Sequence, residues 1–288
     1  MGVDVRPARA ETEQLPRVLG GREAAPPEWL AWAEEPGHDL VAMAGGRAVG
    51  GVHVSIVGQT EGWLEGLRVH PDMQGRGIAG RLVKEGEHLV RHYGAAVVRT
   101  AIPAHDSAAR GVAERAGFRN LARASVVDTE VGPAPAHTPY DAPVETPRPE
   151  TAPSLTHFLE GTPALVAWER LVPLGWRFRR IIPELVRGLA KDHRAAVALQ
   201  PERSEMPQAA VLFAGHDDAV VVSLLDGSAS GMQALFGEMT EYAWERGVSR
   251  IVVFTHDAAT LRAIGTREWR PHPWCPDGLI IAEKNLAS

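Results

Sequence analysis

The stretch that decides the fold is GWLEGLRVHPDMQGRGIAGRLVKEGEHLVRHYGAAVVRTAI, residues 62–102. Its first part, from Trp63 to Val69, alternates apolar and polar residues and predicts a strand. Pro71 ends that strand, because proline cannot donate a hydrogen bond to a sheet ladder. A loop rich in glycine follows, and after it the apolar residues fall on one stripe of a 3.6-residue helix. The members of that stripe are Ile78, Leu82, Val83, Leu89, Val90 and Tyr93.

The glycine-rich loop predicts an anion site at the start of this helix. The first amides of a helix have no partner within it and carry the positive end of its dipole. Glycines let a phosphate approach the backbone closely, and Arg76 and Arg81 add positive charge beside the loop. The alternative is a strand-to-helix turn whose glycines only permit close packing.

The loop also carries a family signature. Gln74-Gly75-Arg76-Gly77-Ile78-Ala79 resembles the Gln/Arg-x-x-Gly-x-Gly/Ala motif of the GNAT superfamily of N-acetyltransferases. The segment from Asp106 to Phe118 is similar to the family's later helix, which ends in Gly-Phe, and the resemblance covers roughly residues 1–130. It implies an α/β protein with a mixed sheet, the GNAT fold, and acetyl-CoA as acyl donor.

The resemblance also assigns residues to the donor. It implies that the loop holds the pyrophosphate, that the strand backbone receives the pantetheine and thioester, and that Asp106, at the family's Asn position, contacts the coenzyme. The implied donor-binding residues are Leu67, Arg68, Val69, Gln74, Gly75, Arg76, Gly77, Ile78, Ala79, Gly80, Arg81 and Asp106. The alternative role of Asp106 is a helix cap.

Length and composition limit the class of protein. A chain of 288 residues is long enough for about two domains. The net charge of −6, without a basic block, argues against nucleic acid. Scattered histidines predict no metal site. The single Cys275 fits a reducing cytoplasm, and the absence of an apolar run of about 18 residues predicts no membrane span. No apolar signal-peptide segment occurs at the start, so we expect a cytoplasmic monomer or homodimer.

The second half of the chain repeats the first. Residues 132–154 are rich in proline and predict a linker. Residues 155–193 predict helix. Strands follow, with a long helix among them. Gly94 and Gly247 each close the long helix of their half. We therefore expect a duplicated GNAT fold, with a catalytic domain at 1–131 and a degenerate copy at 155–288. The turn of the second copy lacks the motif, and no Lys or Arg lies between Arg203 and Arg246.

The resemblance implies direct transfer of acetyl to a primary amine in a ternary complex, which needs a base and an oxyanion donor. Glu65 is one candidate base, because strand alternation predicts that it shares a face with Leu67 and Val69. His53 on the neighbouring strand is another, and His105 a third. Each has a plain structural alternative. A backbone amide near Val69 is the expected oxyanion donor.

Two features leave the function open. Ala113 occupies the position where the family often has a tyrosine as general acid. The thiolate could leave unprotonated or take a proton from water, and Tyr140 could substitute only if the linker folds back. A predicted helix with Trp29 and Trp32 could line an acceptor cleft or belong to the core. The alternative to an enzyme is a non-catalytic acyl-CoA sensor or a protein-interaction module. The acceptor and the acyl-chain preference cannot be read from the sequence.

Overall fold

The computed structural model describes residues 2–8, 37–132, 142–201, 203–216, 218–265 and 268–287. The predicted helices at 11–19 and 27–34, with Trp29 and Trp32, lie outside these residues, as does Tyr140. The chain forms two compact units. Unit 1 comprises Met1–Leu121 and Ile280–Ser288, and unit 2 comprises Ala122–Leu279.

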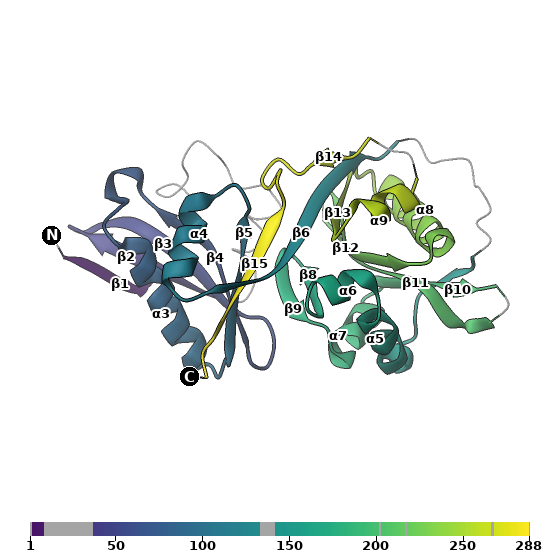
Figure 1. Cartoon of the computed structure of the whole chain (residues 1–288), viewed down its shortest axis with the longest axis horizontal. Helices are drawn as coiled ribbons and strands as arrows, with labels where there is room; N and C mark the ends of the chain where they lie inside the picture. The colour runs from purple at the N-terminus through teal and green to yellow at the C-terminus, as the bar shows by residue number, and fades with distance from the viewer. Residues whose placement is uncertain are drawn as a thin grey trace. The chain divides into compact units, whose positions relative to one another are not determined.

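Unit 1 is a mixed sheet with two helices on one face (Figure 1). Four strands pair antiparallel in chain order, and the fifth pairs parallel with the fourth. The sheet order is β1-β2-β3-β4-β5-β15. Its elements are β1 (Val3–Pro7), β2 (His38–Ala44), β3 (Arg47–Ile56), β4 (Glu61–Val69), η2 (Pro71–Met73), α3 (Ile78–His92), β5 (Val97–Pro103), α4 (Ser107–Arg115) and β15 (Leu279–Asn285).

The α3 helix carries the core of unit 1. Its buried residues recur at the spacing of one helix face and pack on β2, β3 and β4. They are Ile78, Leu82, Val83, Gly86, Glu87 and Val90. The expected stripe is therefore confirmed except at its end: Tyr93 is half exposed and stacks on His38, with ring centroids 5.0 Å apart.

The two units exchange one strand each relative to the domain limits expected from the sequence. The β6 strand (Arg119–Glu130) begins in unit 1 but belongs to unit 2 from Ala122 onward, where it pairs antiparallel with β13 (Arg250–Thr255). Conversely, β15 at the end of the chain belongs to unit 1 from Ile280 onward. The domain limits expected from the sequence place β6 in the first domain and β15 in the second. The structure has the reverse, because a hydrophobic pattern predicts a strand but not the sheet that the strand joins.

A buried arginine fastens β15 into unit 1. Arg99 on β5, 1% exposed, donates from Nη1 to Glu61 Oε1 on β4 (2.6 Å) and from Nε to Glu283 Oε2 on β15 (2.8 Å). Arg119 Nη2 adds a bond of 3.2 Å to the other oxygen of Glu283. A buried cation needs such paired carboxylates, because desolvating it alone is costly. Three strands far apart in the sequence are therefore joined by one guanidinium.

Unit 2 is a second mixed sheet, with order β6-β13-β12-β11-β10-β7. In Figure 1, α8 and α9 cover one face, and α5, α6 and α7 lie on the other. The remaining elements are β7 (Val144–Glu145), η3 (Pro149–Thr151), α5 (Ala152–Glu160), α6 (Pro163–Ala167), β8 (Leu171–Leu174), β9 (Arg177–Arg180), α7 (Pro183–Lys191), β10 (Ala195–Gln200), β11 (Arg203–Gly215), β12 (Val220–Gly227), α8 (Ala229–Glu245), α9 (Ala258–Ala263) and β14 (Arg270–Pro271).

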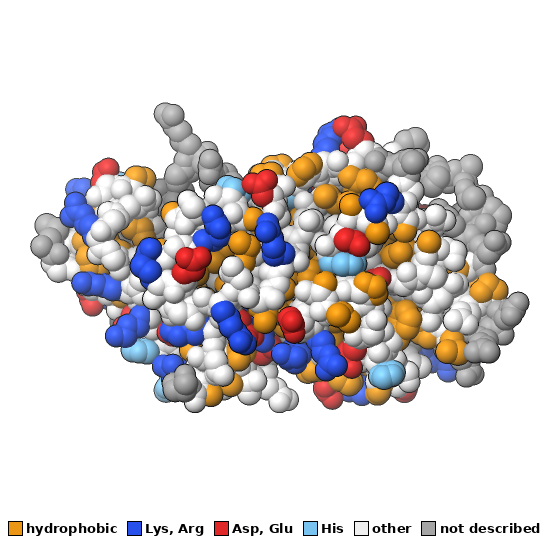
Figure 2. Space-filling model, in the orientation of Figure 1, with side chains coloured by type: hydrophobic (Ala, Val, Ile, Leu, Met, Phe, Trp, Pro, Cys, Tyr) orange, Lys and Arg blue, Asp and Glu red, His pale blue; other side chains and the backbone are white. Residues whose placement is uncertain are grey.

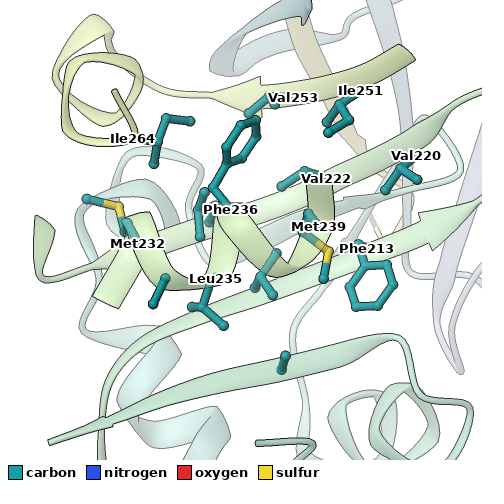
Figure 3. Packing of buried hydrophobic residues seen from close by; sticks show 14 of the residues in the cluster. Phe213, Val220, Val222, Met232, Leu235, Phe236, Met239, Ile251, Val253 and Ile264 are labelled. Atoms are coloured by element: carbon teal, nitrogen blue, oxygen red, sulfur yellow. The ribbon is translucent and has the colours of Figure 1, made fainter. Parts of the chain in front are cut away.

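The core of unit 2 lies between α8 and the sheet. Figure 3 shows Leu235, Phe236 and Met239 of α8 directed at the strands that carry Phe213 and Val222. The single cysteine, Cys275, is also buried. Burial raises the pKa of its thiol to about 12, so it stays protonated at neutral pH and is a poor nucleophile.

The prediction of continuous helix over 155–193 is wrong in its middle. There the antiparallel hairpin β8–β9 separates α6 from α7. Its turn holds Gly175 and Trp176, both with positive φ (57° and 69°). The apolar residues around this turn have no clear period of two, so the sequence does not distinguish a buried hairpin from a buried helix.

No helix in the part of the chain that the structure describes has both the length and the apolar character that a membrane span requires.

We expect Glu283→Ala to lower the free energy of unfolding by about 3–5 kcal/mol, because it removes one carboxylate from a buried arginine. Glu283→Gln, which keeps the shape, should cost less. Urea unfolding of the full chain, followed by circular dichroism, measures both. Glu268→Ala removes one carboxylate from the exposed ion pair with Arg270 and serves as control. An equal effect of Glu283→Ala and Glu268→Ala would contradict the importance of this network.

Candidate functional site

The glycine-rich loop links β4 to α3 through η2. Gln74 Nε2 donates to the carbonyl oxygen of Val69 (3.2 Å) and so ties the loop to the end of β4. Gly75 and Gly77 have φ of 72° and 74°. Side chains other than glycine rarely adopt this left-handed conformation, which explains two of the glycines that the motif requires.

The amino end of α3 is open. Gly77 is its N-cap residue, and no side chain caps the helix there. A Cβ atom added at Gly75, Gly77 or Gly80 would meet no other atom within 4 Å. Arg76 and Arg81 are exposed beside it. Uncapped amides, space and positive charge together suit an anion such as a phosphate.

Basic side chains also lie on the helical face of unit 1. Figure 2 shows Lys and Arg gathered over the region where α3 and α4 lie. Arg81, in the first turn of α3, is held by a hydrogen bond from its Nη1 to the carbonyl oxygen of Val3 on β1 (3.2 Å). This electrostatic environment favours an acidic ligand.

The strand before the loop separates from its parallel neighbour. The ladder between β4 and β5 consists of the pairs Glu61–Val97, Gly62–Val98 and Trp63–Arg99, although β4 runs on to Val69. A bulge follows on the other side of β4, where Gly66 and Leu67 together oppose Val52. Gly66 has φ of 64°, so the bulge depends on glycine.

This bulge overturns the expectation that Glu65, Leu67 and Val69 share one face. Glu65 pairs with His53, whereas Val69 pairs with Gly50. His53 and Gly50 are an odd number of residues apart on β3 and therefore face opposite sides of the sheet. Val69 packs on the core under α3, and Glu65 points to the other side. Simple alternation fails because one extra residue shifts the phase.

Glu65 and His53, the two candidate bases, are brought together on that side. Glu65 Oε1 lies 4.0 Å from His53 Nε2, and Glu65 Oε2 accepts a bond from Trp63 Nε1 (3.0 Å). His53 Nδ1 is 2.8 Å from Asp39 Oδ1 on β2. Asp39 was not a sequence candidate: the turn at Gly45-Gly46 predicts the hairpin β2–β3, but Asp39 pairs with His53 only because of the bulge between Ala42 and Met43.

The other sequence candidates have simpler surroundings. His105 is exposed in the turn before α4. Asp106 caps α4, because its Oδ1 accepts a bond from the amide of Ala109 (2.8 Å). Ala113 is buried in the core of unit 1. No group of three or more His, Cys, Asp and Glu side chains able to hold a metal ion occurs among the described residues.

Unit 2 repeats the architecture of this region. Its ladder between β12 and β13 also consists of three parallel pairs, Val220–Ile251 to Val222–Val253. A bulge follows at Ser223, which has no partner in the register with β11. The long helix α8 then starts after β12, as α3 does after β4. The repetition agrees with duplication of one fold.

The amino end of α8 is closed, unlike that of α3. Ser228 Oγ caps it by accepting a bond from the amide of Gly231 (3.1 Å), and it donates to Gln208 Oε1 (2.8 Å). A Cβ atom at Gly227 or Gly231 would collide with β11. The buried carboxylate of Asp226, which accepts a bond from the amide of Ala164 (2.7 Å), adds negative charge. This end is therefore unsuited to a phosphate.

Comparisons with known proteins agree with this architecture. Residues 9–118 match the model of the acetyltransferase (GNAT) family. No curated protein matches the chain. Among solved structures, a GCN5-related N-acetyltransferase from Sphaerobacter thermophilus has a TM-score of 0.68 at 17% identity, covering 99% of this chain and 96% of that one. A tandem GNAT protein from the clavulanic acid biosynthesis pathway has a TM-score of 0.62 at 15% identity, covering 100% and 99%.

A third structure, of a proposed acetyltransferase from Pyrococcus horikoshii, has a TM-score of 0.59 at 13% identity and covers 99% of this chain and 90% of that one. At these identities the structures show the fold alone. Together with the family match over residues 9–118 they confirm the resemblance of this region to the GNAT superfamily and show that the chain has a duplicated GNAT fold. The class of function that this family indicates is acyl transfer.

We expect Gly77→Asp to weaken coenzyme A binding at least about tenfold relative to Gly77→Asn. Both side chains tolerate a left-handed backbone and can cap a helix, so they differ mainly in the charge placed at the amino end of α3. Isothermal titration measures the affinities, and the wild type should bind one coenzyme A per chain. Equal affinity of the two variants, or two sites per chain, would contradict the assignment.

Proposed function

We propose that the protein is an acetyl-CoA-dependent N-acetyltransferase that acetylates a primary amine by direct attack in a ternary complex. The observation that carries the proposal is the open, uncapped amino end of α3, with left-handed glycines and exposed arginines beside it. The closed end of α8 argues that unit 2 has a structural role instead.

The residues of unit 1 fit this donor. The loop from Gln74 to Arg81 would hold the pyrophosphate through backbone amides and arginine charge. The second half of β4, around Leu67, Arg68 and Val69, lies beyond the ladder with β5 and would receive the pantetheine. When bound, the thioester supplies an activated acetyl group. Asp106 already accepts a hydrogen bond from the amide of Ala109 as the cap of α4, so it would contact the coenzyme while keeping that role.

The chain would supply the acid–base chemistry. As the new C–N bond forms and the C–S bond breaks, Glu65 or His53 accepts the proton that the amine loses. A backbone N–H near Val69 is the proposed donor to the oxyanion. Ala113 has no proton to give, so the departing thiolate takes its proton from water or leaves as the anion.

A second candidate function, a non-catalytic acyl-CoA sensor or protein-interaction module, is favoured by one observation. The helix α4 presents a buried alanine at the place where the family often has its acid. Such a protein would bind acetyl-CoA without turning over any amine.

A panel of small amines, amino-containing antibiotics, peptides and lysine-bearing proteins separates the two candidates. We expect release of free thiol above the rate of hydrolysis for at least one acceptor, and the buried Cys275 should keep the background of the thiol assay low. Initial velocities should give intersecting double-reciprocal lines, as direct attack requires. Gly77→Asp, assayed at an acetyl-CoA concentration well below its Kd, is the low-activity control. Tight acetyl-CoA binding with no turnover across the panel would favour the sensor, and parallel lines would contradict direct attack.

A further inference from the structure

The ladder between β4 and β5 ends at the pair Trp63–Arg99, although both strands run on past it. The second half of β4, beyond that pair, is the stretch proposed above to receive the pantetheine. The loop that would hold the pyrophosphate follows Val69, at the far end of this stretch. The acyl end of the donor would therefore point back along β4 toward the last ladder pair. The residues around Trp63 then determine how long an acyl chain can be.

The face of β4 toward α3 has no space for such a chain. A Cβ atom added at Gly62 would lie 2.7 Å from Cβ of Val90 on α3. One added at Gly86 on α3 would lie 2.8 Å from Cδ2 of Leu64. Neither glycine has a positive φ, so close packing rather than backbone conformation requires glycine at both positions. Because the helix rests directly on the strand here, an acyl chain cannot pass between them.

The opposite face is closed by the indole of Trp63, which is 1% exposed. Trp63 Nε1 donates to Glu65 Oε2 (3.0 Å), two residues further along the same face of β4. Arg99 lies on that face too, because its Nη1 donates to Glu61, two residues before Trp63. Glu283 holds the guanidinium from the other side. The indole is therefore fixed within a row of side chains that are themselves held in place.

We propose that Trp63 is the residue that restricts the donor to short acyl groups such as acetyl. This inference rests on the proposed acetyl-CoA-dependent function and concerns the donor, not the acceptor. Backbone pairing closes the end between the strands and packed core closes the α3 face, whereas a single side chain closes the third path. Nothing has to reach behind that side chain in the wild type, because its burial is what makes it a wall. A smaller residue at position 63 should admit longer chains.

Binding of acyl-CoA esters to the full chain tests this selectivity without an acceptor. Isothermal titration gives the Kd values of coenzyme A, acetyl-CoA, butyryl-CoA and hexanoyl-CoA. We expect the wild type to bind hexanoyl-CoA at least about tenfold more weakly than acetyl-CoA, because a closed pocket discriminates about tenfold or more per methylene. In Trp63→Leu the ratio of these two Kd values should fall at least about tenfold, while the Kd of coenzyme A stays within about threefold.

Two further variants separate the size of the side chain from its other properties. Trp63→Phe removes the hydrogen bond to Glu65 but keeps an aromatic ring, so it should retain the preference for acetyl-CoA. Trp244→Leu makes the same exchange as Trp63→Leu at a half-exposed position on α8 and is the matched control. It should leave the Kd of each ester unchanged.

Contact between the acyl group and the indole can be observed by ¹⁹F NMR of the full chain containing 5-fluorotryptophan. The chain has eight tryptophans, and Trp63→Phe identifies the signal of residue 63. We expect this signal to differ between the complexes with coenzyme A and acetyl-CoA, because only the acyl group distinguishes them. The signal of Trp244 should be the same in both. This measurement decides the matter even if Trp63→Leu does not fold.

The outcomes are separable. Equal affinity of the wild type for acetyl-CoA and hexanoyl-CoA would overturn the proposal, as would an unchanged Kd ratio in Trp63→Leu or a Trp63 signal that does not respond to the acyl group. If Trp63→Phe loses the preference as fully as Trp63→Leu, the hydrogen bond to Glu65 sets it and the proposal fails. Failure to bind coenzyme A at all would contradict the proposed function itself, whereas binding without a chain-length preference contradicts this inference alone.

Discussion

A helix that begins with glycine rather than a capping side chain leaves its first amides to other partners, and α3 is such a helix. The loop before it depends on two left-handed glycines, at positions where most larger residues would be strained. The charge, the open space and the end of β4 all converge on these amides. In unit 2 the same element of the fold has a serine cap, crowded glycines and a buried carboxylate. A few side chains therefore separate an anion site from a closed helix end.

The second constraint is the burial of Arg99. A guanidinium without water must be paired on several sides, and its partners come from β4 and from the last strand of the chain. Unit 1 thus depends on residues near the C-terminus, although the family match ends at residue 118. Because the chain returns to unit 1 at β15, unit 1 is made of two separate segments, Met1–Leu121 and Ile280–Ser288, whereas unit 2 is the uninterrupted segment Ala122–Leu279.

Much of unit 1 could be predicted from the sequence because its signals are local. The loop glycines, the helix stripe and the turn at Gly94 act on neighbouring residues, and the structure places them in the expected order. The bulge at Gly66 could not be predicted in this way. A single glycine in a strand is compatible with regular alternation, and only the pairing with β3 reveals the extra residue.

Features that depend on residues far apart in the chain could not be predicted either, because no local pattern indicates which residues pair. Glu283 and Arg99 are far apart in the chain, and nothing in either segment indicates their pairing. The hairpin β8–β9 lies in an apolar stretch whose pattern fits helix as well as buried strand. The pairing of Asp39 with His53 could be predicted only in part. The turn at Gly45-Gly46 predicts a hairpin, but the residues that pair across it depend on the bulge between Ala42 and Met43.

The amino ends of α3 and α8 should differ in one property: the first binds the coenzyme and the second does not. Hydrogen–deuterium exchange of the full chain, with and without saturating acetyl-CoA, tests it most directly, because it reports on backbone amides in both units at once. We expect slowed exchange in peptides covering Gln74 to Leu82 and no change in those covering Asp226 to Met232. Protection at the start of α8, or none at the start of α3 when acetyl-CoA is bound, would contradict it.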